Sequence, residues 1–103
     1  MATVRTQEEV LQLLRNDMPL LRERYGITRM ALFGSFAQGS PRDDSDVDIV
    51  VEIEASRPLG LKFFELSDYL ADRLGRMIDL VTFGMLKICK EEPETVLRHL
   101  VYI

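Results

Sequence analysis

The sequence contains very little cysteine and no long apolar run. Cys89 is the only cysteine among the 103 residues, so an internal disulfide is impossible and zinc sites built from cysteine pairs are excluded. No stretch approaches the roughly 18 to 20 consecutive apolar residues that cross a bilayer. The N-terminal residues also lack the charged-then-apolar pattern of a secretory signal. We therefore expect a reduced, soluble, cytoplasmic protein without membrane contact.

Positively charged residues are fewer than negatively charged ones. The chain has 13 Lys and Arg against 17 Asp and Glu, which gives a formal net charge of -4. Binding to a nucleic-acid backbone needs clustered cations, and no segment forms a basic stripe, so nucleic acid is not the expected partner. A bound nucleotide is instead expected to be held through metal ions. The length fits one domain, residues 1–103, with a single core.

Hydrophobic periodicity predicts the order helix, strand, strand, helix, strand, helix. Thr6 and Glu9 form a capping box at the start of the first helix, and Gly26 is the expected end. Pro19 predicts a kink, or a break into two helices near residues 16–18. Strands are expected at 28–33, 47–53 and 76–82, with mainly turn and loop at 36–45.

A second helix is expected after residue 58, with one apolar face of Leu59, Phe63, Leu66, Leu70 and Leu74. Beyond residue 84 the pattern weakens until Pro93, which suits the first turn of a last helix carrying Val96, Leu97 and Leu100. Residues 101–103 form either a short strand or the end of that helix. The expected fold class is α/β (α+β), with a small mixed sheet of three to four strands flanked by helices.

Three carboxylates occupy positions that suggest a metal site. Asp46 and Asp48 are two residues apart at the start of a strand, so their side chains point the same way while Val47 faces the core. Two carboxylates this close repel each other unless a cation lies between them, and Mg²⁺ favours such ligands together with phosphate oxygens. Asp79 lies inside an apolar strand and would complete the site if the second and third strands are neighbours.

Each carboxylate has a simpler alternative interpretation. Asp46 could be a turn or cap residue beside Ser45, and Asp79 could form a salt bridge with Arg76 or Lys62. Asp43 and Asp44 are read as solvated loop residues.

Gly34 and Ser35 follow the first strand directly. A glycine there lets the backbone approach a ligand closely, and successive N–H groups can form a small anion-binding nest. A Gly-Ser pair after a strand is usually a plain turn. Its interest comes from the short distance along the chain to the acidic pair.

The spacing Gly34-Ser35, ten residues, then Asp46-Val47-Asp48 matches the Gly-Ser-x10-Asp-x-Asp signature of the DNA polymerase β-like nucleotidyltransferases. The stretch from residue 25 to 53 resembles the minimal nucleotidyltransferase (MNT) family, and Asp79 falls where that family carries its third carboxylate. Family members often have Ala-Arg-Gly after the Gly-Ser, whereas this chain has Gln38 in place of the arginine. Arg42 could substitute for the lost cation.

The resemblance implies a function for each of these residues. Gly34 and Ser35 would hold the β- and γ-phosphates of ATP, with Arg42 as a possible further phosphate ligand. Asp46, Asp48 and Asp79 would be the catalytic residues and the ligands of two Mg²⁺ ions. The family is typically the antitoxin of a toxin–antitoxin pair, and it is understood to transfer AMP to a tyrosine of a HEPN-domain toxin partner in a hetero-oligomer.

Two other functions remain open. The first is a nucleotide-binding module that neutralises its partner by contact, with catalysis weak or lost, and Gln38 keeps this alternative open. The second, transfer to a small molecule or an RNA end, is disfavoured by the small size and acidity of the chain. His99 is expected to be a surface or partly buried residue, and Cys89 a small apolar filler.

Overall fold

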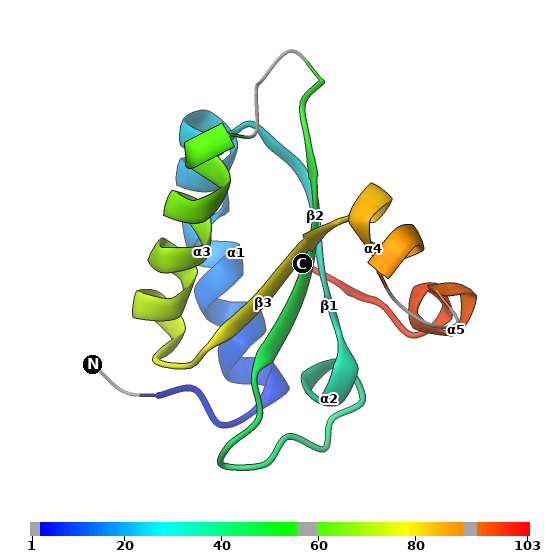
Figure 1. The fold of residues 1–103 in the computed structure, drawn as a ribbon. Helices are drawn as coiled ribbons and strands as arrows, with labels where there is room; N and C mark the ends of the chain where they lie inside the picture. Colours follow the sequence, from blue (N-terminus) through cyan, green and yellow to red (C-terminus); the bar gives the residue numbers. More distant parts are fainter. Residues whose placement is uncertain (1–2, 56–59, 90–92) are drawn as a thin grey trace.

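A computed structural model describes residues 3–55, 60–89 and 93–103. Four strands form one sheet in the order β3 (Ile78–Thr82), β2 (Val47–Ile53), β1 (Ile27–Phe33) and β4 (Val101–Tyr102). Strands β2 and β3 are parallel, whereas β1 runs antiparallel to both β2 and β4 (Figure 1). The predicted α/β class with a small mixed sheet is confirmed.

Helix α1 (Gln7–Tyr25) begins at the predicted capping box. The Glu9 N–H donates to the Thr6 hydroxyl at 3.2 Å, and the Thr6 N–H donates to the Glu9 carboxylate at 3.1 Å. Gly26, with φ of 70°, ends the helix as expected. Of the two predicted alternatives, a kink or a break near residues 16–18, the break is wrong, because α1 is a single helix of 19 residues that contains Pro19. Pro19 is exposed, so the carbonyl that loses its N–H partner there can bind water.

Side chains alternate between the two faces of the sheet and form two apolar clusters. Helices α1 and α3 (Gly60–Leu74) cover one face, and α4 (Phe83–Cys89) and α5 (Pro93–Arg98) cover the other (Figure 1). The α1/α3 cluster includes Leu14, Leu32, Val47, Ile49, Leu66 and Leu80. The α4/α5 cluster includes Ala31, Phe33, Val50, Val81 and Leu86. Strands β1, β2 and β3 therefore contribute to both clusters.

Several boundaries differ from the predictions. Residues 36 and 37, expected as loop, complete a short helix α2 (Gly34–Ala37), because Phe36 is fully buried and fixes that turn. Strand β3 starts at Ile78 rather than at residue 76. Helix α4 has seven residues, too few to show a clear helical period. Helix α5 ends at Arg98, and residues 101–102 pair with β1, which makes them a strand.

Helix α3 ends at Gly75 as predicted, and Leu66, Leu70 and Leu74 are buried on its inner face. Leu59 lies outside the described residues. A polar contact fixes α1 against α3: Tyr69 donates to the Asp17 carboxylate at 2.9 Å, and Arg73 donates at 2.7 Å. Among the helices of the described ranges, none has the length and apolarity to span a membrane.

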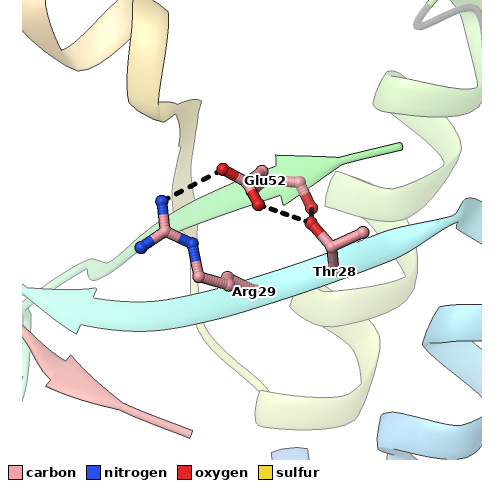
Figure 2. A network of polar contacts seen from close by, with 3 residues as sticks. All are labelled: Thr28, Arg29 and Glu52. Carbon is pink, nitrogen blue, oxygen red and sulfur yellow. Dashed lines mark hydrogen bonds and ion pairs between the residues drawn. The ribbon is translucent and has the colours of Figure 1, made fainter. Parts of the chain in front are cut away.

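A second polar network joins β1 to β2 at the end of the sheet where β1 begins (Figure 2). The Thr28 hydroxyl donates to the Glu52 carboxylate at 2.8 Å, and Arg29 forms an ion pair with it at 3.0 Å. The hydrogen bond from Thr28, and to a smaller extent that from Arg29, lowers the pKa of the Glu52 carboxyl. The Arg29 guanidinium also lies 4.4 Å from the centre of the Phe83 ring, which ties this end of the sheet to α4.

Candidate active site

Asp48 and Asp79 lie side by side on neighbouring strands. They are paired residues in the parallel register of β2 and β3. Asp48 lies between Val47 and Ile49, which face α1 and α3, so its side chain projects to the face covered by α4 and α5. Asp79 projects to the same face, because it is two residues before Val81 of the α4/α5 cluster. The sequence-based condition for Asp79, that its strand neighbours β2, is met.

Gly34 is in direct contact with the Asp48 carboxylate. Phe33 pairs with Asp48 across β1 and β2, so the chain enters α2 beside that side chain. A Cβ atom built on Gly34 would lie 2.0 Å from Asp48 Oδ2, and the φ of Gly34 is +69°. Both the space and the backbone conformation therefore require glycine. Phe33, at the N-cap position of α2, makes no side-chain hydrogen bond to the start of that helix.

Contacts from distant parts of the chain hold α2 in place. The Phe36 side chain is fully buried in the α1/α3 cluster. The Gln7 amide, at the start of α1, donates to the carbonyl oxygens of Phe36 and Ala37, each at 2.9 Å. Ser35 is half-buried in α2, and its carbonyl accepts from the Ser40 N–H at 3.1 Å. The turn is thus positioned by α1 and by the core.

Arg76 fixes the loop that leads to Asp46. Its guanidinium donates to the carbonyl oxygens of Arg42, Asp43 and Ser45 at 3.1, 2.9 and 2.9 Å, and to that of Val4 at 2.6 Å. It also lies over the Phe36 ring, 5.2 Å from the ring centre. One planar cation thus holds the loop, the N-terminal segment and α2 together. Sequence reasoning considered Arg76 only as a partner of Asp79.

The remaining predicted residues lie at the rim of this arrangement. Asp46 is exposed immediately before β2. The hydrogen bonds of the preceding turn belong to Ser45, whose hydroxyl accepts from the Arg42 N–H at 2.8 Å. Asp43 and Asp44 are exposed, as expected. Among the described residues, no three His, Cys, Asp or Glu side chains gather closely enough to hold a metal ion. A site using all three carboxylates thus requires at least one of these side chains to move from its present position.

A cavity of about 270 Å³ opens beside Gly34 and Asp48. Its described lining consists of Phe33, Gly34, Gln38, Asp48, Thr95, Val96 and His99. Gln38, the position at which the family resemblance implies an arginine, therefore borders the predicted site. Arg42 is absent from this described lining. Thr95 and His99 come from the α5 region and were missed as site residues, since no local pattern connects them to a motif some 50 residues earlier.

The profile of the nucleotidyltransferase domain family matches residues 19–103. The chain is 43% identical over 98 residues to the protein adenylyltransferase MntA of Thermococcus cleftensis, which covers 95% of this chain and 96% of that protein. The chain belongs to the nucleotidyltransferase family, and within it to the minimal type.

Solved structures agree with this assignment. A minimal nucleotidyltransferase superposes with a TM-score of 0.74 at 32% identity, covering 97% of this chain and 98% of that one. A toxin–antitoxin structure with AMP-PNP superposes with a TM-score of 0.61 at 26% identity, covering 93% of this chain and 70% of that one. The chain is thus an enzyme of the nucleotidyltransferase class, and its sheet and helices have the arrangement of that fold.

Proposed function

We propose that this chain transfers AMP from ATP to a tyrosine hydroxyl of a HEPN-domain toxin and so acts as the antitoxin of a pair. The observation that carries this proposal is the contact of Gly34 with Asp48, together with the pairing of Asp48 and Asp79. This arrangement supports our assignment of the Gly34–Ser35 turn as a phosphate-binding turn beside two carboxylates. The adenylyltransferase relative supports the reaction, and the toxin–antitoxin structure with AMP-PNP supports the nucleotide and the biological setting.

The donor set suits magnesium. Asp46, Asp48 and Asp79 offer hard carboxylate oxygens next to a turn that leaves room for phosphate, which is the chemistry that Mg²⁺ prefers. We assign these three residues as the ligands of two Mg²⁺ ions. When bound, the ions would neutralise charge on the phosphates and lower the pKa of the acceptor hydroxyl. Gly34 and Ser35 would bind the β- and γ-phosphates through the backbone and the Ser35 hydroxyl, with Arg42 as a further cation at the rim.

The reaction is an in-line displacement at the α-phosphorus. The tyrosine oxygen forms the new bond to phosphorus, while the bond to the bridging oxygen of the β-phosphate breaks and pyrophosphate leaves with the electron pair. Asp79 lies on the side of Asp48 away from Gly34, and in our proposal it accepts the proton of the hydroxyl. Gly34 and Ser35 hold the leaving pyrophosphate on the opposite side.

A second function is favoured by Gln38. This residue lines the cavity beside Asp48 where a fixed cation would otherwise stabilise phosphate. Weaker nucleotide binding would leave a protein that neutralises its partner mainly by contact. Both functions use the same fold, so they are separated by activity and not by structure.

The test is label transfer from α-labelled ATP, with Mg²⁺, to a co-purified HEPN-domain protein. The double variant Asp46→Ala, Asp48→Ala should abolish transfer, and the matched variant Asp43→Ala, Asp44→Ala should retain it. Both pairs are acidic residues close together in the chain, but only the first belongs to the proposed site. Tyrosine as the acceptor is checked by mass spectrometry of the labelled partner.

The outcomes separate the alternatives. Equal transfer by the wild type and the Asp46/Asp48 variant would show that the site assignment is wrong. If neither transfers label while both still suppress the toxin, the chain acts by contact. Loss of transfer in both double variants would indicate a general effect of acidic charge in place of specific ligands.

A further inference from the structure

The cavity beside Gly34 is lined by two parts of the chain that are far apart in the sequence. Gly34 and Gln38 belong to the turn after β1, whereas Thr95 and His99 come from the segment around α5. We propose that this cavity receives the β- and γ-phosphates of the donor nucleotide, and that His99 and Thr95 bind them. The proposal rests on the nucleotidyltransferase function above and names side chains that this function did not assign.

The position of the cavity favours the donor over the acceptor. It borders Asp48 on the β1 side, where Gly34 lies, and Asp79 on the other neighbouring strand is not part of its described lining. In an in-line displacement, the attacking and leaving groups lie on opposite sides of the phosphorus. With the acceptor hydroxyl near Asp79, the cavity lies on the side of the leaving pyrophosphate.

The size of the cavity agrees with this assignment. Pockets that enclose a whole small ligand measure about 300 to 1,000 Å³, and this cavity of about 270 Å³ is slightly smaller. It therefore suits part of a nucleotide better than a complete one. Two phosphate groups fit this description, and the nucleoside would extend beyond the described lining.

The chemistry of the lining selects His99 as the phosphate ligand. Gln38 and Thr95 are neutral and Asp48 is acidic, so among the described lining residues only His99 can carry positive charge. An imidazole donates at least one N–H hydrogen bond whether it is neutral or protonated. The Thr95 hydroxyl adds a second donor. Gln38 cannot provide the positive charge that an arginine would bring to the phosphates, and His99 can replace part of that contribution.

The experiment measures the affinity of the purified chain for a non-transferable ATP analogue with Mg²⁺, and for AMP, by calorimetry. His99→Ala should weaken binding of the analogue about tenfold, the lower end of a lost hydrogen bond to a charged group, and leave AMP binding unchanged. His99→Arg should restore the affinity, and His99→Glu should reduce it further. Because His99 is exposed, all three variants should fold, which circular dichroism checks. Arg98→Ala, an exposed basic neighbour outside the described lining, is the matched control.

Each other outcome overturns the proposal in a distinguishable way. Normal analogue binding by His99→Ala refutes the phosphate contact and leaves the transferase function intact. Normal analogue binding with a raised KM for the protein partner assigns the cavity to the acceptor. Equal losses for the analogue and AMP in all three His99 variants, with lower melting temperatures, indicate a structural role. Failure of the wild-type chain to bind the analogue refutes the proposed transfer of AMP from ATP, and the inference with it.

Discussion

The contact of Gly34 with Asp48 can be tested by one methyl group. Gly34→Ala places a Cβ atom 2.0 Å from Asp48 Oδ2, at a φ of +69°. Gly39→Ala introduces the same methyl group at a φ of +76°, where a Cβ atom meets no described atom within 4 Å. The two variants therefore share the backbone penalty and differ in the contact.

The backbone term is about 1 to 2 kcal/mol for a non-glycine residue in the left-handed region. In a domain of this size each kcal/mol lowers the melting temperature by roughly 4 to 8 °C, so both variants should melt at lower temperature. In Gly34→Ala, Asp48 Oδ2 must also move by about 1.4 Å to reach ordinary contact at 3.4 Å, or α2 must move instead. A displacement of about 1 Å at a reacting centre can reduce the rate about 100-fold.

We expect Gly39→Ala to transfer label at nearly the wild-type rate and Gly34→Ala at about one-hundredth of it. Initial rates of transfer are measured well below both melting temperatures, which are determined by circular dichroism. Similar activity for the two variants would refute the reasoning, because the contact with Asp48 would then have no effect on chemistry. A much lower melting temperature for Gly34→Ala alone would assign the contact to stability.

Three further predictions concern polar side chains that hold the 42–45 loop and helices α1 and α3 in place. Arg76→Ala removes four hydrogen bonds to carbonyl oxygens, so a protease should cleave the 42–45 loop faster than in the wild type. Arg76→Lys should not restore protection from the protease, because lysine lacks the planar set of donors. Arg73→Ala leaves the Asp17 side chain, which is only 13% exposed, without its cation. Because the Arg73 side chain is itself 32% exposed, the free energy of unfolding measured in urea should fall by about 2 kcal/mol, which is less than the roughly 3 to 5 kcal/mol for a broken buried pair. Burial, and secondly the hydrogen bond to Asp17, raises the pKa of Tyr69 above its ordinary value of 10.0. The unfolded chain therefore loses the tyrosine proton first, and stability falls as pH rises above about 10. Tyr69→Phe should make the decline in unfolding free energy between about pH 9 and 11 shallower in the same urea assay, and an unchanged slope would contradict the assignment.

The part of the site that could be predicted from the sequence is local. Gly34 and Asp48 are close along the chain, and strand alternation predicts that Asp48 points away from the face of Val47. Asp46 lies before β2 and is exposed, so its predicted orientation toward Asp48 stays a prediction. The prediction that Asp79 lies near Asp48 depended only on its strand lying next to β2, which is the usual arrangement of a short α/β unit. The fold class followed for the same reason, since the apolar patterns of α1, β2 and α3 are long enough to show their periods.

The rest depended on tertiary contacts. Nothing near Arg76 in the sequence indicates that its guanidinium binds a loop more than 30 residues earlier. Helix α4 is too short to show periodicity, and Pro19 stays within α1 because its position faces solvent. Whether Asp46, Asp48 and Asp79 bind Mg²⁺ stays a prediction, as does the role of Arg42.

The strand directions explain why His99 reaches the site. Strand β1 ends at Phe33, next to Gly34, and β2 begins at that edge of the sheet because it is antiparallel to β1. Strand β3 begins there because it is parallel to β2. Strand β4 begins there as well, being antiparallel to β1, with Val101 opposite Leu32. Continuing this register by two residues carries His99 to the level of Gly34. The two residues of β4 thus set the position of His99, so a change that weakens their pairing with β1 should affect nucleotide binding before it affects the core.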